Sequence, residues 1–132
     1  MNNYIFTSES VSDGHPDKVA DQISDALVDA GLANGDETTR VAIETLVTTN
    51  HVTLAGEVKN FNVSKDEVKQ IVRDKVKEIG YEQDGFHWDN LNIYNEIHSQ
   101  SGDIALGTDD FGAGDQGLMF GYACNHTDSM MP

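Results

Sequence analysis

The chain has 132 residues, enough for one domain with its own hydrophobic core but not for two full domains. Hydrophobic residues make up 38% and charged residues 23%, which is the composition of a globular rather than a disordered chain. The 23 Asp and Glu against 8 Lys and Arg give a net charge of −15, which argues against nucleic acid and anionic membrane surfaces as partners, since their phosphates repel such a chain.

The compartment follows from what the sequence lacks. Cys124 is the only cysteine, so no intrachain disulfide can form. The start Met-Asn-Asn-Tyr has neither the basic nor the apolar region of a secretory signal. No apolar run approaches the ~20 residues that span a bilayer. We therefore expect a cytoplasmic protein.

The first elements are a short strand-like run, a loop and a helix. The run covers 4–6 and the loop 7–14. The helix is predicted to begin at Pro16, because proline suits the first helical position, and to end within 31–35. Its apolar face is marked at helical spacing by Val19, Ile23, Ala26, Leu27 and Ala30.

Two runs of β-branched residues then predict a hairpin, with strands at 40–49 and 51–58. Taking Asn50-His51 as a two-residue turn places Glu44 directly opposite Glu57 on one face. Facing like charges destabilise a strand pair unless a cation or a substrate ammonium group neutralises them. A slipped register, or a solvent-facing pair that splays apart, is the alternative.

The second helix has both of its ends marked. Ser64 with Glu67 forms a capping box, and Gly80 sits where a helix C-cap belongs. The apolar face carries Val68, Ile71, Val72, Val76 and Ile79.

The rest of the chain is predicted as a loop around Asp84-Gly85, a strand at 91–98, a functional loop at 99–117 and a strand at 118–124. The order of helix, strand, strand, helix and strand predicts an α+β fold. In it, helices cover one face of a mainly antiparallel sheet.

A glycine-rich stretch at 112–117 fits the pattern G-x-G-x-x-G. A dinucleotide-binding turn would follow a strand and open a helix, whereas here a loop precedes and a strand-like run follows. The stretch is therefore either a tight turn or a place where bare backbone lets a ligand approach Asp115 and Gln116.

The start of the first helix is a candidate anion site. Unpaired N–H groups and the positive end of the helix dipole favour a phosphate there. His15 and Lys18 are placed to contact its oxygens, and Asp17 to hold the Mg²⁺ that a phosphate chain carries. An ordinary helix start has the same appearance, with Asp17 complementing the dipole and His15 merely exposed.

Taken together, these segments resemble the S-adenosylmethionine synthases, also called methionine adenosyltransferases. The matching stretches, in the family's order, are Phe6-Thr7-Ser8-Glu9-Ser10-Val11-Ser12, Gly14-His15-Pro16-Asp17-Lys18, Ala20-Asp21-Gln22-Ile23-Ser24-Asp25, Glu44-Thr45, Gly56-Glu57, Ile79-Gly80-Tyr81, Gln100-Ser101 with Asp103-Ile104, and Gly112 to Gly117 continuing to Gly121-Tyr122.

The resemblance implies that methionine sulfur attacks the 5′ carbon of ATP and displaces triphosphate, which is then hydrolysed to pyrophosphate and phosphate. It implies that His15 stabilises charge on the leaving group, with Lys18 also at the polyphosphate. Asp17 would hold Mg²⁺ and Glu44 K⁺. The residues that would orient L-methionine are Glu57, Gln100 and Asp115.

The resemblance also implies an assembly, a homodimer or homotetramer with active sites between subunits. By analogy, 1–12 is a segment of a first domain, 13–101 the main α+β domain, 102–117 a gate loop with the glycine-rich motif, and 118–132 the start of a further segment. The segment between Gln100 and Gly112 is shorter than the family's gate loop. Two other functions stay open: a noncatalytic partner or regulator of a full-length synthase, and a stand-alone acidic cation-binding domain.

Overall fold

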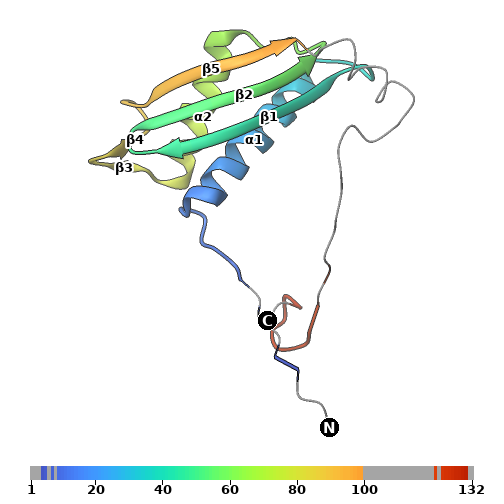
Figure 1. The fold of residues 1–132 in the computed structure, drawn as a ribbon, viewed down its shortest axis with the longest axis vertical. Coiled ribbons are helices and arrows are strands. Elements are labelled where there is room, and N and C mark those ends of the chain that lie inside the picture. The colour runs from blue at the N-terminus through green and yellow to red at the C-terminus, as the bar shows by residue number, and fades with distance from the viewer. Residues whose placement is uncertain (1–3, 6, 8, 100–120, 122, 131–132) are drawn as a thin grey trace.

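The computed structural model describes residues 4, 5, 7, 9–99, 121 and 123–130. Within them lie two helices, a three-stranded sheet and a small two-stranded sheet (Figure 1). The elements in chain order are α1 (Pro16–Ala33), β1 (Arg40–Thr48), β2 (His51–Lys59), α2 (Lys65–Ile79), β3 (Glu82–Gln83), β4 (Phe86–His87) and β5 (Asn92–Ser99).

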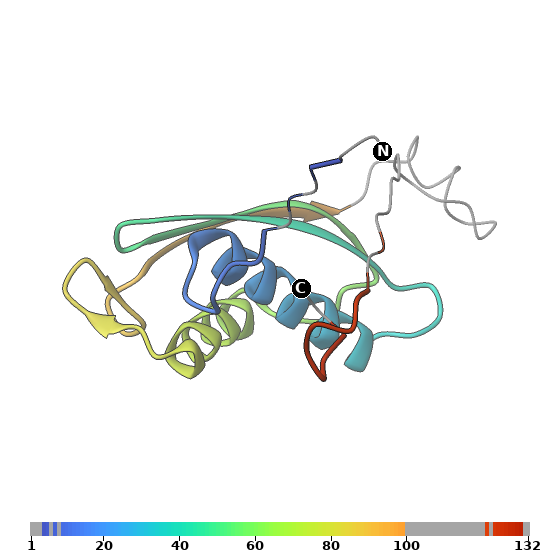
Figure 2. The same ribbon diagram turned by 90° about the horizontal axis from the view of Figure 1, so that it is seen from below.

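Both helices cover the same face of the three-stranded sheet, as Figure 2 shows, and the other face carries no helix of the described residues. The core lies between the helices and the sheet. Its buried side chains are Val19, Ile23, Leu27, Ile43, Val52, Leu54, Val68, Val72, Val76 and Leu91. The predicted α+β class, with helices on one face, is confirmed.

The helix ends follow from local chemistry, as predicted. Pro16 occupies the first turn of α1, and His15 is its N-cap. In α2 both hydrogen bonds of the Ser64–Glu67 capping box are present. Gly80 ends α2 with a left-handed φ of 102°, a conformation that costs glycine little. Neither α1 nor α2 combines the length and apolarity that crossing a bilayer requires.

The predicted register of the β1–β2 hairpin is wrong. Thr48 pairs with His51, so the two-residue turn is Thr49-Asn50, and Glu44 lies opposite Ala55. Asn50 adopts the left-handed conformation, with φ 50°. Its backbone and side chain bond to other segments, which fixes the turn at this position: its N–H donates to the Gly85 carbonyl at 2.6 Å, and its Oδ1 accepts from the His87 N–H at 3.1 Å.

The sheet order is β1-β2-β5, antiparallel between β1 and β2 and parallel between β2 and β5. The parallel pair follows from the crossover of the chain through α2, because a crossover helix brings the next strand back in the same direction. The predicted loop at Asp84-Gly85 is the turn of the β3–β4 hairpin, in which Gly85 has a φ of 87°.

The strands predicted near the two ends of the chain are not found among the described residues. Tyr4 and Ile5 are exposed and are not in a strand, in contrast to the prediction, and Phe6 lies outside the described residues. Of the strand predicted at 118–124, the described Gly121, Ala123 and Cys124 are not in a strand. The loop predicted at 99–117 lies almost entirely outside the described residues.

Candidate functional site

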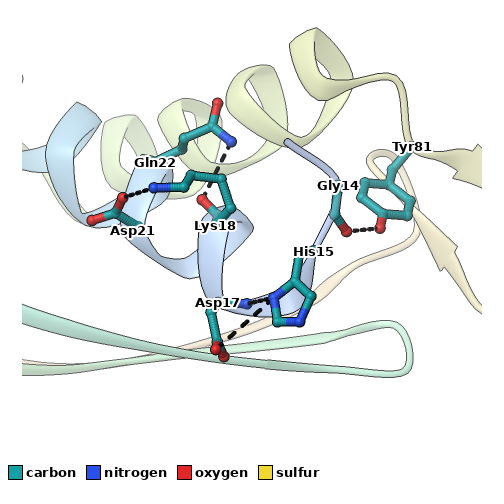
Figure 3. A network of polar contacts seen from close by, with 7 residues as sticks. All are labelled: Gly14, His15, Asp17, Lys18, Asp21, Gln22 and Tyr81. Atoms are coloured by element: carbon teal, nitrogen blue, oxygen red, sulfur yellow. Dashed lines mark hydrogen bonds and ion pairs between the residues drawn. The ribbon is translucent and has the colours of Figure 1, made fainter. Parts of the chain in front are cut away.

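The first part of the site is the N-terminus of α1. The His15 Nδ1 accepts a hydrogen bond from the Asp17 backbone N–H at 3.1 Å, so the ring itself caps the helix (Figure 3). A ring whose Nδ1 accepts carries its proton on Nε2 when neutral. The Nε2–H is therefore a donor, on a side chain that is 41% exposed, where a helix N-terminus favours an anion.

Asp17 and Lys18 follow on the first turn of α1, and the Lys18 side chain is directed toward Asp21 rather than toward the His15 ring (Figure 3). The Asp17 carboxylate is 90% exposed, with Oδ2 at 3.9 Å from His15 Nδ1. Lys18 Nζ lies 2.9 Å from Asp21 Oδ2. The hydrogen bond that Lys18 donates to the Asp21 carboxylate, together with the negative charge of that carboxylate, raises the pKa of Lys18 above its ordinary value. The structure thus brings His15, Asp17 and Lys18 together, with Lys18 already paired to a carboxylate.

A pocket of about 450 Å³ borders this site. Its volume is within the range of small-molecule sites. The walls come from the start of α1, the end of β1 and the β3–β4 hairpin, and they include Pro16, Val19, Val47, Tyr81 and Phe86.

The second part of the site is on the sheet face that no described helix covers. Side chains alternate along a strand, and Ile43 and Leu54 are buried against the helices, so Glu44 and Glu57 lie on the opposite face. Because Glu57 pairs with Ala42, the two carboxylates are diagonal neighbours, with backbones about 7–8 Å apart rather than directly opposed. The shared face was predicted correctly, although the pairing was not.

Glu57 has a basic neighbour that sequence reasoning missed. His98 is its direct partner in the parallel β2–β5 ladder, and His98 Nε2 lies 3.3 Å from Glu57 Oε1. The sequence gives no local sign of this contact, since it depends on which strand follows α2 into the sheet.

The two parts of the site lie at opposite ends of the sheet. Pro16 lines a pocket with Thr48, so His15 lies at the hairpin end of β1. Glu57 pairs with Ala42, six residues of strand away, or about 20 Å at roughly 3.3 Å per residue. The fold therefore does not join His15 to Glu57 within one chain.

The other two predicted site residues, Gln100 and Asp115, lie outside the described residues. In the described part of the chain, no three His, Cys, Asp or Glu side chains converge as a metal site.

Comparison with known proteins gives two matching family models, one after the other along the chain. Residues 3–102 match the N-terminal domain of S-adenosylmethionine synthetase, and residues 110–132 match its central domain.

Curated relatives carry the same name. The S-adenosylmethionine synthase of Paramagnetospirillum magneticum is 60% identical over 136 residues, covering 98% of this chain. The S-adenosylmethionine synthase 2 of Rhodospirillum rubrum is 58% identical over 138 residues, covering 100% of it. The chain spans 35% of the length of each.

A solved structure is also similar, that of an S-adenosylmethionine synthetase from Campylobacter jejuni. It is 40% identical with a TM-score of 0.72. The match covers 92% of this chain and 31% of that one.

Proposed function

The chain belongs to the S-adenosylmethionine synthetase family, and on that premise we propose that it forms the amino-terminal part of an enzyme that makes S-adenosylmethionine from ATP and L-methionine. In the proposed reaction the methionine sulfur forms a bond to the 5′ carbon of ATP. The bond from that carbon to the triphosphate oxygen breaks, and the triphosphate is hydrolysed to pyrophosphate and phosphate. The observation that carries the proposal is the His15 ring, which presents an N–H donor at a helix N-terminus.

His15 acts on the leaving group. As triphosphate departs, negative charge grows on its oxygens, and a donor fixed in advance stabilises that charge without reorganising. The hydrogen bond from the Asp17 N–H fixes the ring, and the α1 N-terminus adds its own positive potential. Lys18 adds a positive charge on the same turn, which the paired Asp21 carboxylate partly neutralises.

Glu57 orients methionine, together with Gln100 and Asp115. The Glu57 side chain is 25% exposed and already holds one cationic partner in His98 when that ring is protonated. A substrate ammonium group is a chemically equivalent partner for the same carboxylate.

The residues also fit the two metal ions of the proposed reaction. Mg²⁺ is usually bound through one or two carboxylates plus substrate phosphates, which suits the exposed Asp17 carboxylate beside the phosphate site. The ion would neutralise charge on the triphosphate. Glu44 on the open sheet face, diagonal to Glu57, gives the concentration of negative charge that a K⁺ site requires.

The distance between His15 and Glu57 supports a site shared between two subunits. Since about 20 Å of strand separates the two ends of the sheet, one copy supplies the polyphosphate residues of a site and a second copy supplies Glu57. A two-fold dimer provides this arrangement, because it repeats the same contact twice and creates two equivalent sites.

The first test uses a full-length synthase in which this chain occupies the amino-terminal part. Formation of S-adenosylmethionine from ATP and methionine is measured by mass spectrometry. His15→Ala, which removes the ring and its N–H donor, is expected to lower kcat by about 10²–10³, the usual cost of one lost donor to a developing anion. Unchanged kcat in that variant would contradict the proposal.

The second test is complementation between two defective copies, His15→Ala and Glu57→Gln. In a mixed dimer, one site contains both substitutions and the other contains neither. Each mixed dimer should therefore have about half the activity of the parent dimer. If His15 and Glu57 of the same copy shared a site, every site would carry one defect and mixing would restore nothing. The control is each variant mixed with itself.

A further inference from the structure

Three consecutive carbonyl groups lead into the candidate phosphate site, and each accepts a hydrogen bond. The Ser12 carbonyl accepts from the His15 N–H at 2.9 Å, and the Asp13 carbonyl accepts from Gln22 Nε2 at 3.1 Å. The Gly14 carbonyl accepts from the Tyr81 hydroxyl (Figure 3). The first two donors belong to this loop and to α1. Of these three donors among the described residues, Tyr81 alone, 67 positions along the chain, ties the loop to another part of the fold.

Tyr81 is itself held on three sides. Its N–H donates to the Val76 carbonyl at 3.2 Å as part of the α2 C-cap, and its carbonyl accepts from the Trp88 N–H at 3.2 Å. Its ring packs edge-on against Phe86, with centroids 4.8 Å apart. The hydroxyl therefore comes from a rigid support, which is what a positioning group needs.

Gly14 precedes His15 directly, so the orientation of the Gly14 carbonyl fixes the peptide plane from which His15 begins. That plane sets where the His15 ring lies relative to the Asp17 N–H it accepts from. A small rotation there would move Nε2, the atom that faces the polyphosphate in the proposed reaction. Misplacement of a reacting group by about 1 Å can cost about 10²-fold in rate.

We propose that Tyr81 is a positioning residue for this reaction: its hydroxyl holds the Gly14 carbonyl and so fixes the His15 ring at the start of α1. The inference rests on the proposed role of His15. It concerns the leaving-group side alone, since Glu57 lies at the far end of the sheet.

The variant is Tyr81→Phe in the full-length synthase, which keeps the ring and its packing and removes the hydroxyl. We expect kcat to fall about tenfold, while the methionine KM changes less than about twofold. The matched control is Trp88→Phe. It also removes one side-chain hydrogen bond from the neighbouring hairpin, from Trp88 Nε1 to Glu82 Oε1 at 2.9 Å, but none to the loop, and kcat should stay within about twofold of the parent.

A double-mutant cycle separates positioning from general loosening. If Tyr81 acts through His15, then Tyr81→Phe has no further effect on kcat in the His15→Ala background. Losses that multiply in the double variant would overturn the inference, as would equal losses for Tyr81→Phe and Trp88→Phe.

Hydrogen exchange gives a readout that does not depend on activity. Amides of 12–19 should exchange severalfold faster in Tyr81→Phe than in the parent, with Trp88→Phe unchanged in that segment. Unchanged exchange would overturn the inference. If His15→Ala itself leaves kcat unaltered, the proposed function fails instead, and the exchange rates still decide whether Tyr81 holds the loop.

Discussion

Glu57 faces His98 across the parallel β2–β5 ladder, with 3.3 Å between Oε1 and Nε2. We predict that Glu57→Gln in the full-length synthase raises the methionine KM about 10- to 150-fold. A hydrogen bond to a charged group contributes about 1.5–3 kcal/mol, and the amide keeps the shape but loses the charge. Steady-state kinetics with varied methionine measure the effect, and an unchanged KM would remove Glu57 from the methionine site.

His98→Gln is the control for that experiment. It removes the neighbour of Glu57 and leaves the carboxylate in place. The His98 side chain is 65% exposed, and exposed ion pairs are worth about 0–1 kcal/mol, so the methionine KM should change less than about fivefold.

Glu44→Gln should weaken activation by K⁺ and leave the methionine KM close to that of the parent. Glu44 lies on the same open face as Glu57 but diagonal to it, so the two carboxylates can serve different cations. Potassium titrations of both variants separate the roles. A Glu44→Gln curve identical to that of the parent would contradict the K⁺ assignment.

Arg73 holds the segment between β4 and β5. Its guanidinium donates to the carbonyls of Trp88, Asp89 and Leu91 at 2.6, 2.7 and 3.0 Å. Lysine cannot reach three acceptors with the same planar geometry, so Arg73→Lys should lower the local opening free energy by about 1–2 kcal/mol. Hydrogen exchange of 86–92 measures this. Arg40→Lys, which loses bonds to the Glu37 and Thr39 carbonyls instead, should leave that segment unchanged.

The capping box makes α2 sensitive to acid. Hydrogen bonds from Ser64 lower the pKa of Glu67 below its ordinary 4.5. A lowered folded-state pKa means that the stabilisation is present above about pH 4.5 and is lost as the pH falls through the folded-state value. Circular dichroism of a peptide covering 60–82 should show helicity that falls on acidification, and falls less with Glu67→Gln. Identical titrations of the two peptides would exclude this role.

The helices could be predicted closely because their signals are local. Pro16, the Ser64–Glu67 box and Gly80 each act within one helical turn, and all three do in the structure what their sequence positions indicate. The α+β layering followed from the same periodicities.

The register could not be predicted because distant contacts decide it. Hydrogen bonds to Gly85 and His87 hold Asn50 in the turn. Neither partner lies in the hairpin sequence from which the register was predicted. The parallel position of β5, and with it the His98–Glu57 contact, depends on the path of the chain through α2. In the sequence Tyr81 stood out only as part of a family motif. Its hydrogen bond to Gly14 could not be predicted, since the two residues are 67 positions apart.

The last prediction concerns the 132-residue chain alone, which we expect to form no S-adenosylmethionine from ATP, methionine, Mg²⁺ and K⁺. The reason is electrostatic. ATP and its displaced triphosphate carry several negative charges, and the chain itself has a net charge of −15, so it cannot neutralise them. At the start of α1 the described groups that can meet this charge are the His15 N–H donor and Lys18, and Lys18 is already paired with Asp21.

Each missing donor to the leaving group costs about 10²–10³ in rate, so a site that lacks several loses measurable turnover. The chain also spans only 35% of the length of its curated relatives, which leaves room for those donors in the part that it does not cover. The measurement is mass spectrometry of S-adenosylmethionine formed by the purified chain, beside the full-length synthase at equal concentration. A noncatalytic partner would show itself by changing the rate of a separate full-length synthase on mixing, and turnover by the chain alone comparable to the full-length rate would contradict the electrostatic argument.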